Sequence, residues 1–443
     1  MRWTIFVGTI ASILFCRFGL RIHGVTGDLI PIVEWRWKAP RIVSVERGTA
    51  SQNSPAREFT NSYPQFLGPN RNGVLPGPAL ARDWKRTTPR ELWRHAVGSA
   101  WSGLAIQGRG AVTQEQRGED ELVVCYDLAS GREVWSHIDK AHFKSTIAGE
   151  GPRATPTIVG NRVYSIGGAG ALNCLDLATG QTIWTTNTLV AYGARLPEWG
   201  VACSPLVNDR AVIVTIGGRS HALVAYEKNS GAVLWASGQD DPHWSSPVHV
   251  TLDGVPQIVV FSENVSGYDE QTGAVLWQYP WRSPHPHVSV PVVVGNNRLL
   301  VSQGYGGGSE LIEVARENER WHTQRIWKSI RLKSKFGTLV QLHGFVYGLD
   351  DGALACIDVN TGELKWKGDR YGHGQMILVG DLLLLMAESG EIVLLEPNPT
   401  EQRELARFKV FNAKTWNPPA LAGDLLVVRN DREAACLRLP LAR

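Results

Sequence analysis

Short apolar segments separated by turn residues recur along most of the chain. In one unit, residues 156–159, 162–166, 171–175 and 181–184 are short runs of mainly apolar or alternating side chains, and Gly, Asn and Asp stand between them. Short runs with such turn residues between them are typical of antiparallel β-hairpins. The pattern therefore predicts a four-stranded antiparallel meander that is repeated along the chain.

A phrase recurs at the end of these units: an acid, two variable residues, Ser or Thr, Gly, three variable residues and Trp. It begins at Asp127, Asp176, Glu227, Asp269 and Asp358. We expect the Gly to supply a positive φ angle and the acid to accept hydrogen bonds from backbone N–H groups of the turn. A repeat with a period of tens of residues indicates a solenoid, a propeller or an array.

A single meander cannot bury both of its faces, and radial packing of such units leaves only short, protected edges, as in a β-propeller. The recurring Trp is expected to fill the space between neighbouring blades, where it buries about 150–250 Å². The Trp positions, with a degenerate Phe, number eight and predict eight blades: Trp93, Trp135, Trp184, Trp235, Trp277, Trp327, Trp366 and Phe408. The first seven are the predicted structural blade tryptophans.

The two ends of the repeat region predict how the ring closes. The last unit contains segments 419–422, 425–429 and 435–439 but no fourth strand, whereas the strand around Trp93 has no three strands before it. We therefore expect an all-β, eight-bladed β-propeller of four-stranded antiparallel blades, with the last blade closed by the N-terminal strand around Trp93. Asp never follows these tryptophans, which argues against a WD40 repeat.

Composition narrows the classes of partner and site. The chain has 443 residues and a net charge of +3, and its Lys and Arg are scattered, so no basic stripe indicates a nucleic acid partner. Cys125, Cys174, Cys356 and Cys436 fall at one position of the repeat, which is typical of small core residues. No CxxC or CxxCH motif for zinc or haem is present, and no metal site is predicted.

The N-terminus differs in kind from the repeats. Arg2 precedes the apolar run 3–16, which has the length of a signal-peptide core and is shorter than the roughly 18–20 residues of a spanning helix. We expect an exported protein, periplasmic or membrane-anchored, in which residues 1–21 are either a cleaved signal peptide or a retained anchor. Residues 22–62 are expected to be a linker and residues 63–443 the propeller.

The recurring phrase resembles the PQQ-like (pyrroloquinoline quinone) propeller repeat of the quinoprotein-like superfamily. Bacterial quinoprotein dehydrogenases and the outer-membrane assembly lipoprotein BamB share this repeat. The chain resembles more closely the exported PQQ-binding-like β-propeller repeat proteins of uncertain function, and the matching segments are 63–73, 199–205, 302–306, 370–375 and 414–419. The segments 24–28 and 34–37 also resemble the stretch that follows a membrane segment in such proteins, which favours an anchor.

The resemblance implies a non-catalytic, monomeric scaffold that binds a protein or a small ligand through its axial face or rim. The alternative is an oxidoreductase that depends on PQQ or another cofactor and has an atypical site. Methanol-type quinoproteins hold the quinone with a vicinal disulfide, a stacking Trp and Ca²⁺, whereas this chain has no Cys-Cys dipeptide and no evident acidic cluster for calcium. No cofactor is therefore assigned. A third hypothesis, a sugar- or polymer-binding module, rests only on the abundance of Trp.

If the family topology holds, the loops that lead into the first strand of each blade converge on one axial face, where binding residues are expected. His373 stands between two glycines and is the first candidate for mutation, while His285 and His287 lack a third metal ligand. Other polar or aromatic positions at this face are Trp101, Ser102, Ser246, Ser289, Lys333 and Tyr371. The candidate ligand-binding residues are Arg153, Thr155, Trp199, Cys203, His243, Trp244, His285, His287, Lys335, His373, Gln375, Lys414, Trp416 and Asn417.

Overall fold

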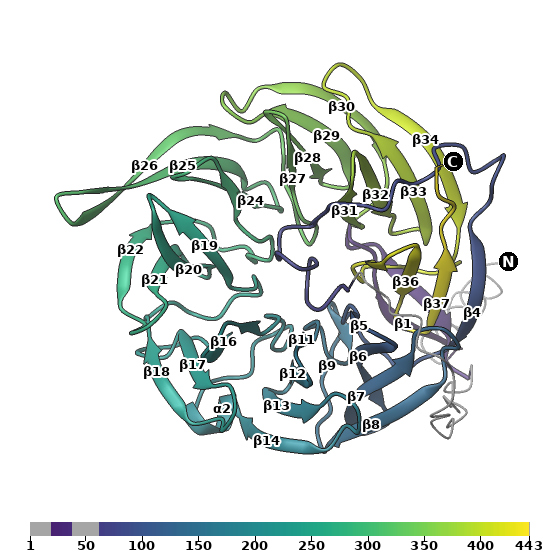
Figure 1. Ribbon diagram of the computed structural model, residues 1–443, viewed down its shortest axis with the longest axis horizontal. Helices are drawn as coiled ribbons and strands as arrows, with labels where there is room; N and C mark the ends of the chain where they lie inside the picture. Colours follow the sequence, from purple (N-terminus) through teal and green to yellow (C-terminus); the bar gives the residue numbers. More distant parts are fainter. Residues whose placement is uncertain (1–18, 38–61, 443) are drawn as a thin grey trace, which may run out of the picture.

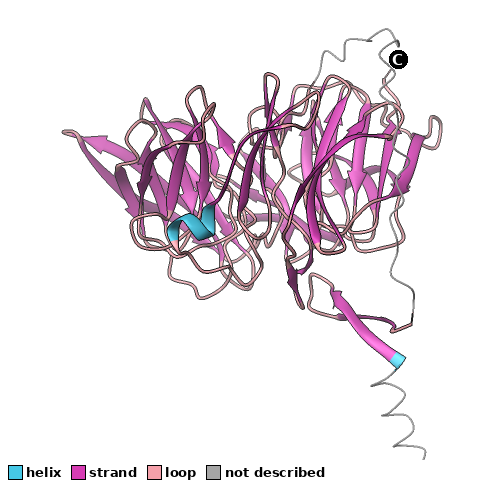
Figure 2. Ribbon diagram, turned by 90° about the horizontal axis from the view of Figure 1, so that it is seen from below, coloured by secondary structure: helices cyan, strands magenta, loops and turns pink. Residues whose placement is uncertain are grey.

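The structure is a computed structural model that describes residues 19–37 and 62–442. The described residues are almost entirely β, and eight sheets of four or five strands lie around a common axis (Figure 1). Seen from the side, the ring of sheets is a flattened disc (Figure 2). The all-β architecture and the propeller arrangement are those predicted from the repeat.

In six sheets, four consecutive strands pair antiparallel in sequence order. The first three are β5 (Ala105–Gln107), β6 (Gly110–Arg117), β7 (Asp120–Asp127) and β8 (Glu133–Asp139); β11 (Thr157–Val159), β12 (Arg162–Ile166), β13 (Ala171–Asp176) and β14 (Thr182–Asn187); and β15 (Leu206–Val207), β16 (Ala211–Thr215), β17 (Leu223–Glu227) and β18 (Val233–Ser237). The next three are β19 (Val248–Leu252), β20 (Val255–Phe261), β21 (Val265–Asp269) and β22 (Val275–Tyr279); β23 (Val292–Val294), β24 (Arg298–Gln303), β25 (Gly308–Glu317) and β26 (Arg320–Ser329); and β27 (Val340–Leu342), β28 (Phe345–Asp350), β29 (Ala353–Asp358) and β30 (Leu364–Arg370).

The remaining two sheets each combine strands from both ends of the propeller. One sheet contains β31 (Gln375–Val379), β32 (Leu382–Met386), β33 (Glu391–Glu396) and β34 (Arg403–Lys409), with β3 (Val74–Leu75) added in parallel to β31. The other contains β35 (Ala420–Ala422), β36 (Leu425–Arg429) and β37 (Glu433–Arg438), and its fourth strand is β4 (Arg90–Ala96). In this sheet Trp93 of β4 pairs with Cys436 of β37.

The recurring phrase builds the turn between the third and fourth strands of a sheet. In the first copy, Asp127 Oδ1 accepts hydrogen bonds from the backbone N–H and the hydroxyl of Ser130, and Gly131 has a φ of 71°. The same turn recurs at Asp176, where Oδ1 bonds Thr179 and Gly180 has a φ of 71°. The acid therefore fixes the turn, and Gly adopts the left-handed conformation that costs other residues energy.

Five of the predicted blade tryptophans lie on the turn of the next sheet, where the glycine of the phrase leaves room for the indole. A Cβ atom on Gly180 would lie 2.5 Å from the Trp135 ring, and the Trp135 indole N–H donates to the carbonyl of Leu177 in the same turn. The remaining glycine–tryptophan contacts of this kind join Gly131 to Trp93, Gly231 to Trp184, Gly273 to Trp235, and Gly362 to Trp327. The phrase thus encodes contacts between sheets as well as the turn within one.

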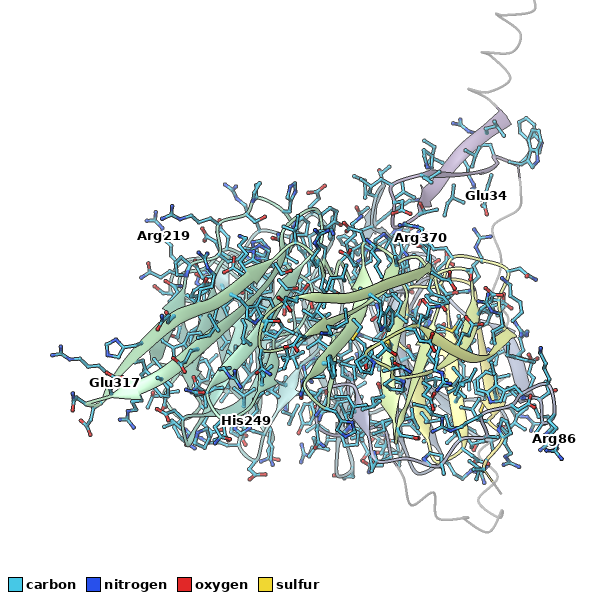
Figure 3. The ribbon with its side chains drawn as sticks, turned by 90° about the horizontal axis from the view of Figure 1, so that it is seen from above. Glu34, Arg86, Arg219, His249, Glu317 and Arg370 are labelled. Atoms are coloured by element: carbon cyan, nitrogen blue, oxygen red, sulfur yellow. The ribbon has the colours of Figure 1, made fainter. Side chains whose placement is uncertain are left out.

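Two tryptophans pack differently because the following sheet lacks the phrase. Trp277 donates to Gln257 Oε1 of its own sheet, since the next sheet has the long β25–β26 hairpin in place of the turn. This hairpin extends beyond the ring, and Glu317 lies near its tip (Figures 1 and 3). Trp366 donates to the carbonyl of Asn398 in the next sheet.

The core lies between neighbouring sheets. One cluster joins Val112, Cys125 and Trp135 of the β5–β8 sheet to Val163 and Leu175 of the next sheet. Cysteines occupy this position repeatedly, and burial raises the pKa of the Cys125 thiol to about 12. The four cysteines expected in the core are buried free thiols: Cys125, Cys174, Cys356 and Cys436.

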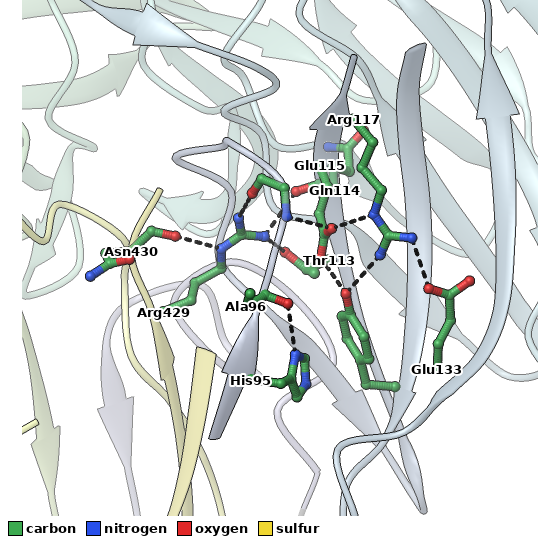
Figure 4. Close-up of polar contacts among 11 residues, drawn as sticks. His95, Ala96, Thr113, Gln114, Glu115, Arg117, Glu133, Arg429 and Asn430 are labelled. Carbon is green, nitrogen blue, oxygen red and sulfur yellow. Dashed lines mark hydrogen bonds and ion pairs between the residues drawn. The ribbon is translucent and has the colours of Figure 1, made fainter. Parts of the chain in front are cut away.

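A buried polar network fastens the β35–β37 sheet to the β5–β8 sheet (Figure 4). The fully buried Arg429 donates to the carbonyls of Gly98 and Gln114 and to the hydroxyl of Thr113. In the second sheet, Glu115 accepts from Tyr126 and pairs with Arg117. Because burial lowers the pKa of Arg429, its buried charge depends on these acceptors.

Residues 62–75, named here the crossing segment, pass through the centre of the ring (Figure 1). The segment bonds successive inner strands: Tyr63 pairs with Ile106, and the carbonyl of Pro64 accepts from Ile158. Further along, the buried Arg71 donates to the carbonyls of Ser204 and Pro205. On one side of the ring, the axis is therefore filled by the crossing segment of the chain itself.

Residues 20–35, most of which were expected to be linker, form a two-stranded antiparallel ribbon of β1 (Leu20–Val25) and β2 (Pro31–Trp35). The ribbon projects from one face of the disc (Figure 2). The linker expectation for these residues was wrong because Thr26-Gly27-Asp28 is a turn sequence between two runs of β-forming side chains. Residues 1–18 of the predicted signal or anchor and residues 38–61 of the predicted linker lie outside the described residues. Within the described ranges, no helix is long and apolar enough to cross a membrane.

Replacing Gly180 by Ala should test the contact between sheets. The new Cβ would meet the Trp135 ring at 2.5 Å and φ is 71°, so we expect a loss of about 3 kcal/mol from backbone strain plus overpacking. Gly254→Ala is the matched control, because Gly254 has a φ of 77° but nothing within 4 Å of the added Cβ; it should cost about 1 kcal/mol. Chemical denaturation of both variants measures the difference, and equal losses would contradict the seam interpretation.

Replacing Arg429 by Met should weaken the join between the two ends of the chain. Three buried acceptors lose their donor, so we expect a loss of about 3 kcal/mol or more in unfolding free energy. Amide exchange should rise first in β37 and β4. Arg403→Met, which removes a half-exposed ion pair with Glu396, should change stability by less than about 1 kcal/mol. An Arg429 variant as stable as this control would show that the network does not fasten the join.

Candidate functional site

A cavity of about 150 Å³ lies on the ring axis between the ribbon and the crossing segment. Val25, Thr26, Gly27 and Leu29 of the ribbon cover it, and Phe66 of the crossing segment lines it from within the ring. The remaining walls come from the inner loops of the sheets: Trp101, Ile147, Ala148, Arg153, Thr155, Trp199, Ala202, Ser204, Trp244, Ser246, Val288, Tyr305, Phe336, Gln375, Trp416 and Pro418.

The cavity walls are mainly aromatic and held in place by their polar ends. Trp101 lies 4.9 Å from Trp416, and Trp199 lies 4.6 Å from Trp244, measured between ring centroids. The indole N–H groups of Trp101, Trp244 and Trp416 donate to Ala148, Gly200 and Glu388, respectively. The indole N–H of Trp199 and the Oε1 atom of Gln375 are buried without a partner among the described residues. The walls therefore offer mainly flat apolar surfaces, and these two unpartnered polar atoms are themselves buried in the protein.

Arg153 lines the cavity but its donors are already used. The guanidinium donates to the carbonyls of Ala148, Gly149 and Gly151, which belong to the loop around β9 (Lys144–Ser145) and β10 (Gly149–Glu150). It also lies 4.3 Å from the centre of the Phe143 ring. Burial lowers the pKa of Arg153 to about 9. Its main contribution is thus to hold the loop that carries one wall.

Two lysines at the rim of the cavity bind the backbone of the ribbon. Lys414 Nζ donates to the carbonyl of Val25 at 2.8 Å and lies 3.8 Å from the centre of the Trp416 ring. Lys335 Nζ donates to the carbonyl of Gly27 at 2.9 Å. Burial lowers the pKa of Lys414 to about 8. The ribbon carbonyls accept hydrogen bonds from both ammonium groups at the mouth and thereby occupy donors that an anionic ligand would otherwise use.

The ribbon tip is also bound through Gly27 and Asp28. The backbone N–H of Gly27 donates to Glu388 Oε1 at 2.7 Å, and a Cβ atom on Gly27 would lie 2.0 Å from the His373 ring. The Asp28 carboxylate contacts His373 Nε2 at 3.1 Å and accepts from Arg370 at 2.8 Å. Arg370 lies on the face of the disc from which the ribbon projects (Figure 3). We call these contacts, together with the two lysine contacts, the ribbon latch.

The titration of the latch follows from its geometry. Burial opposes ionisation of Asp28, but hydrogen bonds from His373 and Arg370 outweigh it and lower the pKa of this carboxyl. Burial lowers the pKa of His373, an effect that Asp28 partly offsets. The carboxylate of Asp28 is therefore charged near neutral pH, where the latch is complete.

The structure brings together many of the residues predicted from the sequence. The cavity walls include Trp101 and Ser246 as well as six of the candidate ligand-binding residues: Arg153, Thr155, Trp199, Trp244, Gln375 and Trp416. Lys335, His373 and Lys414 lie at the rim and bind the ribbon. His373 accordingly contacts the chain itself through the ribbon.

Other predicted residues lie outside the cavity. The His243 and His287 rings stack at 4.2 Å, and burial lowers the pKa of each to about 4, so this pair is neutral. His285 is exposed and stacks on Tyr305. Cys203 is fully buried and donates to the carbonyl of Thr215. Asn417 donates to the carbonyls of Ala100 and Ser102, which is a structural bond.

Three further predicted positions have structural bonds, and a fourth is buried. Ser102 donates to the carbonyl of Ala154, and Lys333 forms an ion pair with Asp350. Tyr371 donates to Glu404, and Ser289 is buried. Among the described residues, no group of three or more His, Cys, Asp or Glu side chains is placed to hold a metal ion.

The sequence analysis missed the ribbon tip, Phe66, Phe336, Arg370 and Glu388. Residues 24–28 were treated only as a stretch resembling one that follows a membrane segment, and nothing in their spacing says that they return to the axis. The signal that could have helped is the turn sequence Thr26-Gly27-Asp28 between two β-forming runs. Its docking partner could not be deduced, since Glu388 lies 361 residues away from Gly27.

Comparison with known proteins agrees with the observed architecture. The chain is 24% identical over 319 residues to the outer membrane protein assembly factor BamB of Yersinia pestis, which covers 70% of this chain and 68% of the relative. The crystal structure of BamB from Moraxella catarrhalis aligns with a TM-score of 0.58 and 17% identity, covering 81% of this chain and 99% of that chain. A europium-containing methanol dehydrogenase aligns with a TM-score of 0.67 at 11% identity, covering 87% and 99% of the two chains. These structural likenesses concern the fold.

A family model described as outer membrane protein assembly factor BamB matches residues 119–368, which is more than half of the chain. This range contains all five copies of the recurring phrase, from Asp127 to Trp366, and the β23–β26 sheet, which lacks the phrase, lies between the fourth and fifth copies. The recurring phrase, the ring of sheets and this match lead to one conclusion: the chain belongs to the PQQ-like β-propeller family represented by the BamB model.

Proposed function

We propose that this protein is an exported, membrane-held and non-catalytic propeller that serves as a scaffold for a protein partner in the assembly of outer membrane proteins. The observation that carries the proposal is the ribbon latch. The cations at the axial mouth, Lys335, Lys414 and Arg370, are bonded to the chain's own ribbon. Because the ribbon occupies the axial mouth, a partner is expected to bind either the loops on the opposite face of the disc or the strands at the rim of the ring.

The architecture that we infer is a closed, eight-bladed ring in residues 63–443. The eight sheets supply the blades, and pairing of β4 with β37 joins the two ends of the chain. Such a join lets a ring resist opening because the two chain ends are held in one sheet. A rigid ring supports loops at fixed positions, which is the property that a scaffold needs.

The proposed place of action is the bacterial envelope. The apolar run 3–16 supports export, and relatives described as outer membrane protein assembly factors support a role beside the outer membrane. We propose that residues 1–21 provide the export signal and are retained as an anchor. A monomer with a protein partner is the simplest assembly consistent with this role.

The alternative function, a PQQ-dependent oxidoreductase, is weakened by the cavity itself. PQQ is a rigid tricyclic tricarboxylate, whereas a cavity of about 150 Å³ has room for a ligand about the size of benzene. The cations around the cavity are also bonded elsewhere: Arg153 to loop carbonyls, and Lys335 and Lys414 to ribbon carbonyls. With the ribbon docked, the residues present do not fit this cofactor.

Deletion and complementation in the host organism test the proposed function. Deletion should lower the amount of folded outer membrane proteins, measured by quantitative mass spectrometry of the outer membrane fraction. Ala202 lines the cavity, so an Ala202→Phe variant narrows it; a scaffold with this change should still restore the normal level. Failure of this variant, when it is as stable as the wild type, would favour a ligand-dependent role. An unchanged amount of folded outer membrane proteins after deletion would overturn the proposal.

Substitutions in the ribbon tip test the latch. In Gly27→Ala the new Cβ would overlap His373, so we expect the tip to leave the mouth and amide exchange at residues 27–29 to rise about ten-fold or more, as for a locally opened segment. Ile30→Ala, at a 60% exposed position of the same turn, is the control and should leave exchange unchanged.

The latch should also respond to pH in a defined direction. The pKa of Asp28 in the docked ribbon lies below its usual value of 3.8. The ionised carboxylate therefore stabilises docking of the ribbon fully above pH 3.8, and this stabilisation is lost as the pH falls through the lowered pKa of the docked state. Asp28→Asn should abolish this acid-induced release. For the Gly27→Ala variant of the preceding test, unaltered amide exchange at residues 27–29 would show that the latch contacts do not hold the ribbon tip.

A further inference from the structure

The ribbon has one polar face and one apolar face. Cross-strand pairing places Arg21 opposite Glu34 on one face, and Ile22 opposite Val33 and Leu20 opposite Trp35 on the other. Side chains of directly paired residues lie on the same side of a two-stranded ribbon. The alternation therefore separates charged from apolar side chains, as in a sheet that packs one face against an apolar phase.

The polar face is turned to the propeller. Glu34 accepts from Arg432, which belongs to the loop between β36 and β37, and it also lies 3.8 Å from Arg21. At the other end of the ribbon, the latch fixes Gly27 and Asp28 to the axial mouth. The ribbon is thus held at both ends, and the direction of its apolar face is set by the ring.

The apolar face is exposed. Ile22 is 59%, Val33 52% and Trp37 66% exposed, and Trp37 stacks on Trp35 with ring centroids 6.2 Å apart. Ile30, in the turn before β2, is 60% exposed. An exposed cluster of large apolar side chains on a projecting element marks an interaction site. Figure 2 shows that this element stands clear of the disc on one side.

The sequence before the ribbon indicates what covers this face. The apolar run 3–16 ends only a few residues before Leu20, so a membrane-inserted run would bring the ribbon to the bilayer surface. Tryptophan is enriched at the boundary between the hydrocarbon and water, and Trp35 and Trp37 lie at the end of the ribbon that is nearest to this run in the paired register. The exposed Arg36 between them adds a charge suited to anionic headgroups.

We propose that the apolar face of the ribbon, formed by Ile22, Ile30, Val33, Trp35 and Trp37, lies in the interface of the lipid bilayer. The ribbon then fixes the orientation of the propeller relative to the membrane. The axial mouth with the ribbon latch faces the membrane, and the opposite face of the disc faces the aqueous compartment. This inference rests on the proposed membrane-held state. It adds an orientation that a flexible anchor alone would not impose.

Site-specific photo-crosslinking of the full chain tests the inference. The photoreactive residue p-benzoylphenylalanine replaces Val33 in one variant and Ile138 of β8, which is 49% exposed, in the control. Each variant is reconstituted in vesicles of phosphatidylethanolamine and phosphatidylglycerol, illuminated and analysed by mass spectrometry. Because only the ribbon is proposed to enter the interface, we expect at least about ten-fold more lipid adduct at position 33 than at position 138. Equal melting temperatures verify that both variants are folded.

Each other outcome overturns the inference in an identifiable way. Crosslinks from position 33 to residues 1–18 or 38–61 of the same chain would show that the chain covers the apolar face itself. Crosslinks to another copy would show self-association. A membrane-bound chain with no lipid adduct at position 33 would show that the ribbon does not contact the bilayer. A full chain that does not float with the vesicles would overturn the membrane-held state, and with it this orientation; the complementation experiment with Ala202→Phe would remain as a separate test of the scaffold role.

Discussion

The contact between an indole of one blade and a glycine of the next is the constraint on which this ring depends. Trp135 lies where any side chain on Gly180 would have to be, and its N–H bonds the turn that Gly180 closes. Shape and hydrogen bonding therefore have to match at the same point. Because five of these tryptophans contact a glycine of the following sheet, those sheets depend on their neighbours for stability, and successive sheets are held in one ring.

The axis of the ring shows a second consequence of this architecture. Inner strands that surround an axis leave backbone groups and loop side chains facing a narrow space, and buried polar groups need partners. Here the chain supplies them: Arg71 of the crossing segment reaches Ser204, and Gly27 of the ribbon reaches Glu388. What remains is a small aromatic cavity with two covers, which favours a structural use of the axis over passage of a large ligand.

The ribbon links this axis to the membrane orientation that we propose for the protein. Its polar contacts with Arg432 and His373 hold it on the ring, while its apolar side chains face outward. The same two-residue periodicity that builds the blades thus produces an element with two different partners. Its tip contacts the mouth, and its exposed apolar face is the surface that we propose to lie in the membrane interface, so one short hairpin would set the proposed orientation.

Much of the fold could be predicted because it depends on local patterns. The turn between β13 and β14 needs only Asp176, Thr179 and Gly180, which are close in sequence, and the four strands of that unit lie within a residue or two of the predicted segments, except that β14 runs on to Asn187. The candidate residues that reached the cavity, such as Trp199 and Gln375, were also found from their place in the repeat, just before a first strand. Periodicity thus located the axial loops without any structure.

The sequence by itself determined the type of blade, the recurring seam and the loops that approach the axis, since these follow from short-range patterns and from repetition. Only the tertiary structure decided which loop side chains face the cavity, that His243 and His287 stack against each other, and that the ribbon docks on Glu388 and His373. The ribbon contacts join residues 361 and 345 positions apart, and His243 and His287 are 44 positions apart. Each contact occurs once, so the repeat does not predict it. Their physical basis is complementarity of shape and charge between surfaces that exist only after the ring has formed.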